Sequence, residues 1–295
     1  MKKRLGMSDR MFDILVTVFV SIWLVVVLYP LIYVVSSSFS SGEAVTTGKV
    51  LLWPVEFSLT GYELVFKNQK VWTGYANTIF YTIVMTIINV VYTTMMAYVL
   101  SRKDFQARKL FTTLYLIPMW FGGGMIPKYV LMASMGLTNS RWGYIIMTGI
   151  GISNMIIMRT YFQSSIPAEM MEAAKVDGIT DIGYLLKIAL PLAKPVISVI
   201  TLYYLVGHWN DYFGPLIYLR AEELQPLQLI LRGLLASAKV DTSAMTDLSA
   251  VAKISGAEDV MKYSLIVVST LPMLILYPFV QKFFDKGVMM GSLKG

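Results

Sequence analysis

Six long apolar runs alternate with polar stretches along the chain, and this alternation is the dominant pattern of the sequence. A helix needs roughly 20 apolar residues to cross the hydrocarbon core of a bilayer, and each run is close to that length. The pattern therefore predicts an all-α, polytopic membrane protein with six transmembrane helices. The predicted spans are residues 14–35, 76–100, 110–132, 144–162, 196–219 and 263–284.

The third apolar run contains "PMWFGGGMIP", which predicts a break in the helix between Pro118 and Pro127. Irregular backbone at membrane depth is tolerated where it lines a cavity or packs within protein. We therefore expect this break, with Trp120 beside it, to border a transport path.

Two polar connections are long enough to hold structure of their own, residues 36–75 and 220–262. In the first, "TGYELVFKNQKVW" at 60–72 predicts one interfacial helix. In the second, residues 244–260 predict a short amphipathic helix. Loops of this length are uncommon without a role, so contact with a soluble partner is an alternative to a plain solvated connection.

Composition supports the membrane assignment, because 56% of the 295 residues are hydrophobic and only 15% are charged. Soluble domains average about 45–50% apolar and about 25% charged residues. If the N-terminus is cytoplasmic, one face carries 15 basic and eight acidic residues, and the other carries ten of each. The whole net charge of +7 then lies on one side. The positive-inside rule places both termini in the cytoplasm.

The first apolar run follows Lys2, Lys3 and Arg4, so a cleaved signal peptide is an alternative to a retained membrane anchor. A signal peptide's apolar region spans roughly 7–15 residues, which favours the anchor for this longer run. "SSSFS" at 36–40 is the weak candidate for a cleavage site. The chain has no cysteine, which excludes disulfide bonds.

A charged island, "EMMEAAKVDG" at 169–178, lies between the fourth and fifth runs on the predicted cytoplasmic side. Pro167 suits the first turn of a helix, and Glu169 and Glu172 suit its positive N-terminal end. Gly178 is a typical helix stop. A second helical piece is expected over 181–190, before prolines at 191 and 195 bend the chain.

Ala174 and Gly178 are four residues apart, with Ala173 beside them, so the island has a face of small residues. Such a face would let another protein approach the backbone closely, with Glu172 at its edge. The residues alone leave a second interpretation open, an ordinary loop helix that lies on lipid headgroups.

The stretch "EMMEAAKVDGITDIGYLLKIALPLAKP" resembles the EAA loop of binding-protein-dependent ABC importer permeases. One departure from the usual pattern is Ile179, where alanine is frequent. "ANTIFYT", "AYVLSR" and "MIPKYVLMASMGLTNSRWGYII" extend the resemblance to maltose-transporter-like carbohydrate permeases, and "VGHWNDYFGPLIYL" and "PLQLILR" to those for complex oligosaccharides. The matching motif residues are Glu172, Ala173, Ala174, Asp177, Gly178, Ile188, Leu190, Pro191 and Pro195.

The resemblance implies the transmembrane domain of a type I ABC importer in a bacterial cytoplasmic membrane. It implies a second homologous permease subunit, two ATPase subunits that bind ATP and Mg, a solute-binding protein and an oligosaccharide substrate. The EAA loop would be a coupling helix seated in the ATPase. The residues expected to couple to it are Glu172, Ala173, Ala174, Asp177, Gly178, Leu190 and Pro191.

The C-terminal "KGVMMGSLKG" contains Gly287, Gly291 and Gly295, which predict a flexible or extended tail. A frayed end is the plain interpretation. The resemblance implies instead that the tail, with Gly291, Lys294 and Gly295, reaches between the ATPase subunits.

The fifth run holds the densest set of polar and aromatic residues within a span, between Tyr203 and Tyr212. A sugar site needs flat aromatic faces and hydrogen-bonding groups. An interfacial aromatic belt with Asn210 and Asp211 as caps is the alternative, and Asn77 and Asn89 suit contacts between helices. The candidate residues of the translocation path are Trp120, Tyr204, His208, Trp209 and Asn210.

No nucleotide-binding, metal-binding or catalytic pattern occurs, since "GGGMIPK" lacks the spacing of a phosphate-binding loop and His208 is the only histidine. We therefore expect no cofactor, no nucleic-acid partner and no enzyme activity in this chain. The rival class, a stand-alone ion-coupled transporter, predicts acidic residues within the spans and an internal repeat. Neither is visible. The predicted division is 1–75, 76–286 with the loops 164–195 and 220–262, and the tail 287–295.

Overall fold

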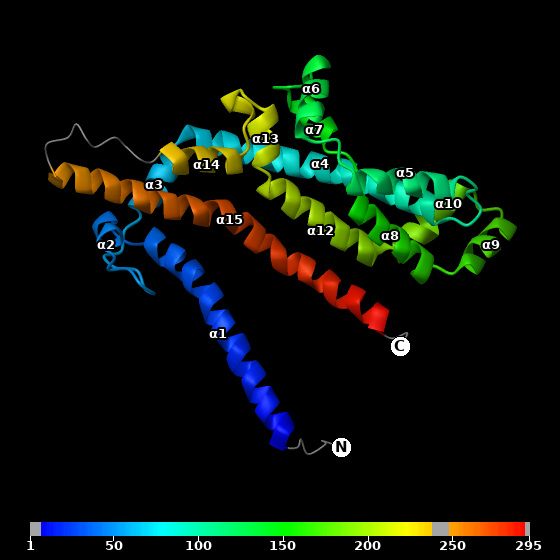
Figure 1. Ribbon diagram of the computed structural model, residues 1–295, viewed down its shortest axis with the longest axis horizontal. Coiled ribbons are helices and arrows are strands. Elements are labelled where there is room, and N and C mark those ends of the chain that lie inside the picture. The colour runs from blue at the N-terminus through cyan, green and yellow to red at the C-terminus, as the bar shows by residue number, and fades with distance from the viewer. Residues whose placement is uncertain (1–6, 238–247, 293–295) are drawn as a thin grey trace. The chain divides into compact units, whose positions relative to one another are not determined.

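The computed structural model describes residues 7–237 and 248–292, which form helices and connecting segments with no strand among them. Figure 1 shows these helices along the chain, and by their internal contacts they separate into two compact units. The first comprises residues 1–69 and 233–271, and the second comprises 70–232 and 272–295. These contacts group the chain differently from the predicted linear division at 75 and 286, since α14 and α15 each contribute to both units.

The first unit contains three helices and the start of a long fourth one. They are α1 (Met7–Ser38), α2 (Gly42–Thr46), α3 (Thr60–Lys67) and the first part of α15 (Leu248–Ser292).

The second unit contains the last part of α15 and, except for the end of α14, which belongs to the first unit, the remaining elements. In chain order they are α4 (Gln69–Ser101), α5 (Arg108–Trp120), α6 (Met125–Ser134), α7 (Arg141–Met147), α8 (Ile152–Ser165), α9 (Ala168–Val176), α10 (Asp181–Tyr184), the π-turn η1 (Leu185–Ala189), α11 (Leu190–Leu192), α12 (Lys194–Asn210), α13 (Phe213–Tyr218), the 3₁₀ turn η2 (Glu222–Leu224) and α14 (Leu227–Ser237).

Three helical stretches are long and apolar enough to cross a membrane: Arg10–Ser38, Gln69–Ser101 and Gly256–Pro278. Three bent pairs bring the number to six if each pair counts as one span. The bends measure 110° between α5 and α6, 50° between α7 and α8, and 80° between Asp181–Leu192 and α12. The six transmembrane helices predicted from the sequence equal the larger of these two numbers of spans. The orientation of the termini stays a prediction.

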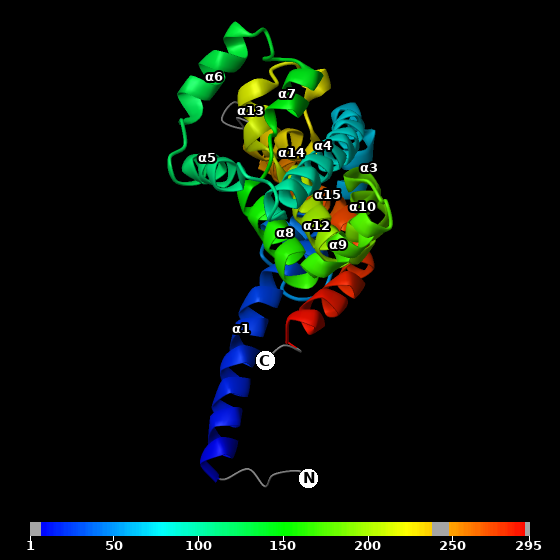
Figure 2. The same cartoon turned by 90° about the vertical axis from the view of Figure 1, so that its right-hand side faces the viewer.

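The predicted break in the third run is confirmed, and it falls at 121–124. Gly124 has a φ of +82°, a left-handed conformation that glycine adopts without strain. Figure 2 shows α6 turned away from α5 at this point.

Three sequence predictions about helix limits are wrong. Residues 60–72 form α3 and the start of α4, separated at Asn68, in place of one interfacial helix. Residues 248–260 are the beginning of α15, which runs without interruption into the sixth apolar run. The fifth run is not one helix over 196–219, since α12 ends at Asn210 and α13 begins at Phe213.

The C-terminal segment also differs from the prediction of an extended tail, because α15 continues to Ser292 and includes Gly287 and Gly291. Lys294 and Gly295 lie outside the described residues. Residues 238–247 lie outside them as well.

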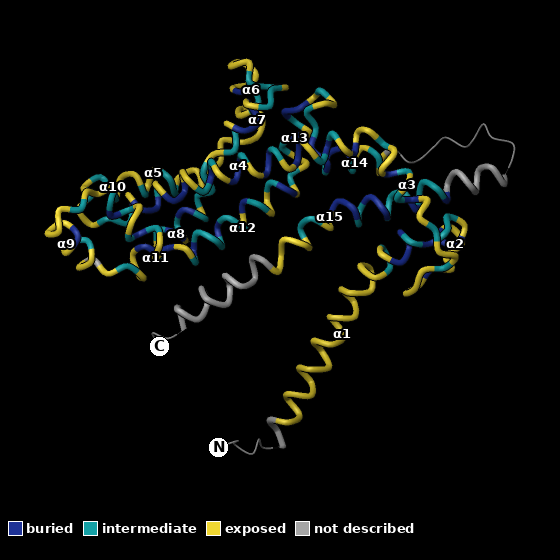
Figure 3. The backbone as a smooth tube through the Cα atoms, turned by 180° about the vertical axis from the view of Figure 1, so that it is seen from behind, coloured by how far each residue is buried: buried dark blue, intermediate teal, exposed yellow. Residues whose placement is uncertain are grey.

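Small residues hold the first unit together. Gly42 and Gly256 approach so closely that a Cβ on Gly42 would lie 2.5 Å from the backbone carbon of Gly256. The serines of "SSSFS" are buried, and three of them are hydrogen-bonded through their hydroxyls: Ser36 to the Leu52 carbonyl, Ser38 to the Val35 carbonyl and Ser40 to the Ser36 carbonyl, each at 2.7 Å. The Ser264 hydroxyl donates to the Ser38 carbonyl at 3.3 Å. The body of α1 is exposed along its apolar length (Figure 3). It is a surface suited to lipid or to another membrane helix.

The second unit packs around α4, which contributes buried side chains from Val71 to Leu100. Its largest buried cluster includes Met155, Met158 and Phe162 of α8 and Ile200 of α12. Outside this cluster, α4 anchors the segment after α13: Asn77 Nδ2 donates to the carbonyls of Glu223 and Gln225 at 2.8 and 3.0 Å. The core thus fixes α8 and α12, the helices that flank the charged island.

Candidate functional site

The charged island forms helix α9, as the sequence predicts, and its two ends have identifiable causes. Pro167 occupies the N-cap position and Glu169 lies in the first turn. At the other end Gly178 has a φ of +75°, and the Ile179 amide donates to the Ala174 carbonyl at 2.9 Å. A Cβ on Gly178 would meet no atom within 4 Å. The glycine is therefore required for its backbone conformation, not for space.

The two alanines of the motif differ in burial. Ala174 is 4% exposed and belongs to the buried cluster that includes Tyr98, Phe162 and Tyr184. Ala173 is exposed. The prediction that both alanines face a partner is wrong for Ala174, because its small side chain lets α9 approach its own protein core.

An exposed face remains on the other side of α9. It carries apolar, small and acidic side chains together, and Val176 is 88% exposed. Its members are Glu169, Met170, Glu172, Ala173, Val176 and Asp177. We call these six residues the outer face of α9.

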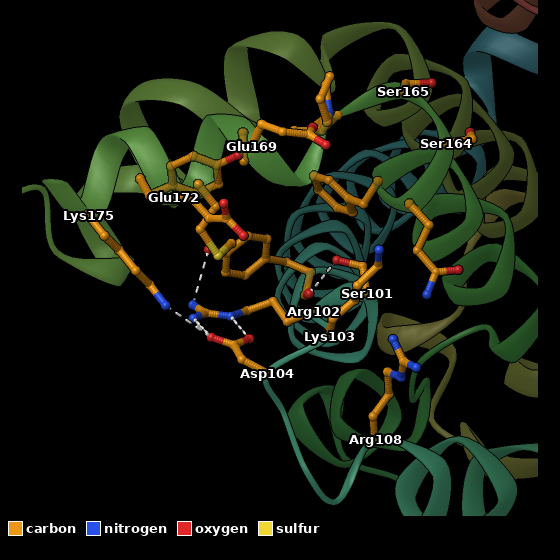
Figure 4. Close-up of a pocket in the computed structure, with 18 residues that line it drawn as sticks. Ser101, Arg102, Lys103, Asp104, Arg108, Ser164, Ser165, Glu169, Glu172 and Lys175 are labelled. Atoms are coloured by element: carbon orange, nitrogen blue, oxygen red, sulfur yellow. Dashed lines mark hydrogen bonds and ion pairs between the residues drawn. The ribbon is translucent and has the colours of Figure 1, made fainter. Parts of the chain in front are cut away.

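A charge network holds α9 and the segment after it to the end of α4 (Figure 4). Arg102 makes a bidentate pair with Asp104, Nε donating to Oδ1 at 2.9 Å and Nη2 to Oδ2 at 2.5 Å. Arg102 Nη1 donates to Asp181 Oδ1 at 2.6 Å, and Lys175 Nζ reaches Asp104 Oδ2 at 3.3 Å. We call these four residues the Arg102 network.

The network changes the ionisation of its members. The Arg102 guanidinium hydrogen-bonds the Asp104 carboxylate and holds the pKa of that carboxyl well below its usual range. The same hydrogen bond raises the pKa of Arg102. The Arg102 side chain is only 12% exposed, whereas Asp104 and Asp181 are 46% and 63% exposed. Arg102 is therefore the buried centre of the network and the acids form its rim.

The rest of the predicted coupling set lies in the bent segment that leads to α12. The Thr180 hydroxyl accepts from the Gly183 amide at 3.1 Å and caps α10. Leu190 is half-buried and Pro191 is exposed, next to the bend that precedes α12. They shape the turn, and the outer face of α9 does not include them.

The candidate translocation residues divide into two groups. Tyr204 and Trp209 are 7% and 5% exposed, and His208 is partly buried. Trp120 is 78% exposed, and Asn210 is also exposed, with its Nδ2 donating to the Val206 carbonyl of its own helix at 3.0 Å. The structure therefore brings Tyr204, His208 and Trp209 together inside the unit and leaves Trp120 and Asn210 on its surface.

The inner group joins α12 to α4. The Tyr204 hydroxyl lies 2.7 Å from Thr93 Oγ1 and accepts from the Gly151 amide at 3.0 Å. His208 Nε2 lies 3.3 Å from Asn89 Nδ2, which confirms the interhelical role predicted for Asn89. Such interhelical hydrogen bonds are typical of packing within a membrane bundle.

Asp211 acts as a cap, as one of the two sequence interpretations has it. Its Oδ1 accepts from the Gly214 amide at 3.0 Å, near the start of α13. Its Oδ2 accepts from the Tyr144 hydroxyl at 2.7 Å.

Sequence reasoning missed Arg102, Asp104 and Asp181 as functional residues. Their signal is present as charges in "SRKDF" and "GITDIG", but the pairing joins positions 79 residues apart. Nothing in a single sequence indicates that these two loops meet.

Bent apolar helices, interhelical polar contacts and a charged helix outside the apolar core define a helical, multi-pass membrane protein. Comparison with known proteins refines this class. No protein-family model matches the chain. The chain is 37% identical over 290 residues to the polygalacturonan/rhamnogalacturonan transport system permease protein YtcP of Bacillus subtilis (strain 168), covering 98% of this chain and 100% of that protein.

The chain is also 36% identical over 289 residues to protein LplC of Bacillus subtilis (strain 168), covering 98% and 96% of the two chains. Among solved structures it is similar to a bacterial ABC transporter involved in the import of the acidic polysaccharide alginate. The TM-score is 0.87 at 38% identity, over 95% of this chain and 99% of that one. The chain belongs to the family of sugar and oligosaccharide ABC transport system permeases.

Proposed function

We propose that this chain is one of two unlike permease subunits of an ABC importer in a bacterial cytoplasmic membrane, and that α9 is its coupling helix. The observation that carries the proposal is the geometry of α9. One side is fixed to its own core through Ala174 and Lys175, and the other presents the exposed outer face. A helix held in this way can be displaced by a partner and can move the core to which it is attached without unfolding.

In this proposal, two ATPase subunits bind ATP and Mg and close upon binding. Closure moves the outer face of α9, and the Arg102 network passes the displacement to the end of α4. The buried contact of Ala174 passes it to the cluster containing Phe162 of α8. The bundle then changes between inward-facing and outward-facing states, and the substrate shifts this equilibrium only through contacts that differ between the two states.

We infer that the cargo is an acidic oligosaccharide delivered by a solute-binding protein. The support is the function of two similar proteins, one a polygalacturonan/rhamnogalacturonan transport system permease and the other an importer of the acidic polysaccharide alginate. Within this chain, Trp120 and Asn210 remain the candidate path residues that are accessible, while Tyr204, His208 and Trp209 support the helices from inside. The C-terminal tail with Gly291, Lys294 and Gly295 is proposed to contact the ATPase subunits.

Reconstitution of the transporter in vesicles tests the coupling role. Scrambling residues 167–183 is expected to abolish ATP-dependent uptake while the chain still inserts and co-purifies with the second permease. Full uptake by the scrambled variant would overturn the proposal. Uptake driven by an ion gradient, by this chain without an ATPase, would instead establish a secondary transporter.

A further inference from the structure

A cavity of about 580 Å³ lies between the end of α4, the end of α8 and helix α9 (Figure 4). Arg102, Asp104 and Lys175 of the Arg102 network form part of its wall, and each of these charges has an opposite partner. Glu169 and Glu172 line the cavity from α9. The coupling proposed above uses the Arg102 network and the outer face of α9, and it leaves Lys103 and Arg108 of the same cavity without a role.

Another part of the wall carries two cations that make no ion pair within the described part of the chain, across the cavity from the carboxylates of Glu169 and Glu172. Lys103 and Arg108 both line the cavity, and among the described residues neither has a carboxylate partner. Arg108 reaches in from α5, on the other side of the cavity from Glu169 and Glu172 (Figure 4). Arg159 of α8 is close enough to Arg108 for the two guanidinium groups to repel each other. Arg159 does not line the cavity, so it contributes positive charge near Arg108 and no contact to an anion bound there.

The local backbone adds to this positive field. Helix α5 begins directly at Arg108, its N-cap residue Ala107 provides no side-chain hydrogen bond, and its first turn contains no acidic residue. The amide groups of a helix's first turn carry a partial positive charge and are unsatisfied unless capped. The cations of the cavity and the N-terminal end of α5 therefore both favour the binding of an anion.

An apolar surface starts immediately beside these cations. Phe111 and Met119 of α5 are 41% and 49% exposed, and their spacing, three and eleven residues after Arg108, puts them on the side of the helix that carries Arg108. A molecule with a phosphate group at Arg108 and hydrocarbon chains along α5 would meet suitable chemistry at both ends.

We propose that Lys103 and Arg108 bind the phosphate group of an anionic phospholipid in this cavity, next to the attachment of α9. Basic pockets at the ends of membrane helices recognise such headgroups through charge and hydrogen bonds. The other source of the same chemistry is a free phosphate ion. The proposal rests on the cavity and its charges, and it stands whether or not α9 couples to an ATPase.

Native mass spectrometry of the full chain, purified with the subunits that accompany it, tests the proposal. The probe is an equimolar mixture of phosphatidylglycerol and phosphatidylcholine. The unmodified protein is expected to retain phosphatidylglycerol preferentially. Arg108→Gln and Lys103→Gln are each expected to weaken retention about ten-fold, the effect of losing one charge-assisted contact. Lys109→Gln is the matched control, since Lys109 is exposed and does not line the cavity.

Two further arms separate the sources and guard against misfolding. Displacement of the lipid by millimolar inorganic phosphate, with the same dependence on Arg108, would assign the site to the free ion. Persistence of the lipid would assign it to the headgroup. Arg108→Lys is expected to keep most of the binding. The proposal would be overturned if the protein retained the two lipids equally and bound no phosphate. It would also be overturned if Arg108→Gln and Lys109→Gln lost equal amounts of lipid, or if Arg108→Lys lost as much as Arg108→Gln.

Discussion

Replacing Arg102 with alanine removes the buried centre of the network that holds α9. Three hydrogen bonds to carboxylates are lost, two to Asp104 and one to Asp181. A hydrogen bond to a charged group contributes about 1.5–3 kcal/mol. Both carboxylates are more than a third exposed, so water screens the pairs and rehydrates the acids once Arg102 is gone. The net local loss is therefore about 1–2 kcal/mol, rather than the larger cost of stranding a buried charge.

Hydrogen–deuterium exchange of the purified complex measures this loss. Local opening free energies set amide protection. A loss of about 1–2 kcal/mol corresponds to exchange that is roughly 5- to 30-fold faster across α9 in Arg102→Ala. Protection of α12, which the network does not touch, should stay the same. Lys187→Ala is the control, because Lys187 is exposed in the same connecting segment and has no ion pair among the described residues. Unchanged exchange in α9 of Arg102→Ala would refute the role assigned to the network.

Three other changes test separate parts of the account. Gly178→Ala should cost about 1–2 kcal/mol in local stability, since alanine disfavours the left-handed conformation at φ +75°, whereas Gly122→Ala, with open space around it, should cost less by the same exchange measurement. Ala174→Leu should lower the free energy of unfolding by about 1–3 kcal/mol through overpacking, measured as a lower melting temperature. Ala173→Leu should leave the fold intact and weaken co-purification of the ATPase subunit. Because the pKa of Asp104 is lowered on folding, its contribution to the exchange protection of α9 is constant above about pH 4 and is lost only as the pH falls further. A difference in protection between the unmodified protein and Asp104→Asn that vanishes between pH 8 and 6 would contradict this pH dependence.

Sequence patterns predicted the parts of the fold that depend on local physics. Apolar length located the candidate spans, and Pro167 with Gly178 marked α9 almost to the residue. The glycines at 122–124 marked the break between α5 and α6. In each case the deciding interaction lies within a few residues of the chain.

Other features were not predictable because they depend on distant contacts. Periodicity places Ala173 and Ala174 on adjacent positions of one helix, and only the packing against Tyr98 and Phe162 decides that Ala174 is the buried one. Tyr204 looked suited to sugar, but Thr93 and Gly151 use its hydroxyl to join helices.

The limits of α15 illustrate a third kind of failure. The polar sequence at 244–260 suggested a separate short helix, yet no proline separates it from the sixth apolar run at Tyr263. Gly256, a residue that usually weakens a helix, is needed here because it packs against Gly42. A close approach between two backbones leaves no trace in the pattern of apolar and polar residues.

The central claim is that the outer face of α9 contacts an ATPase subunit and drives transport through that contact. The chain has no cysteine, so single cysteines can be introduced cleanly at Ala173 on the outer face and at Ala174 in the core. The decisive measurement is cross-linking of each variant to its accompanying subunits with a cleavable thiol-specific photo-reagent, followed by uptake before and after cleavage. The account predicts that Ala173→Cys links to the ATPase subunit and that uptake stops until the link is cleaved, while Ala174→Cys gives no link. An ATPase link absent at 173, or uptake that continues with the link intact, would contradict it.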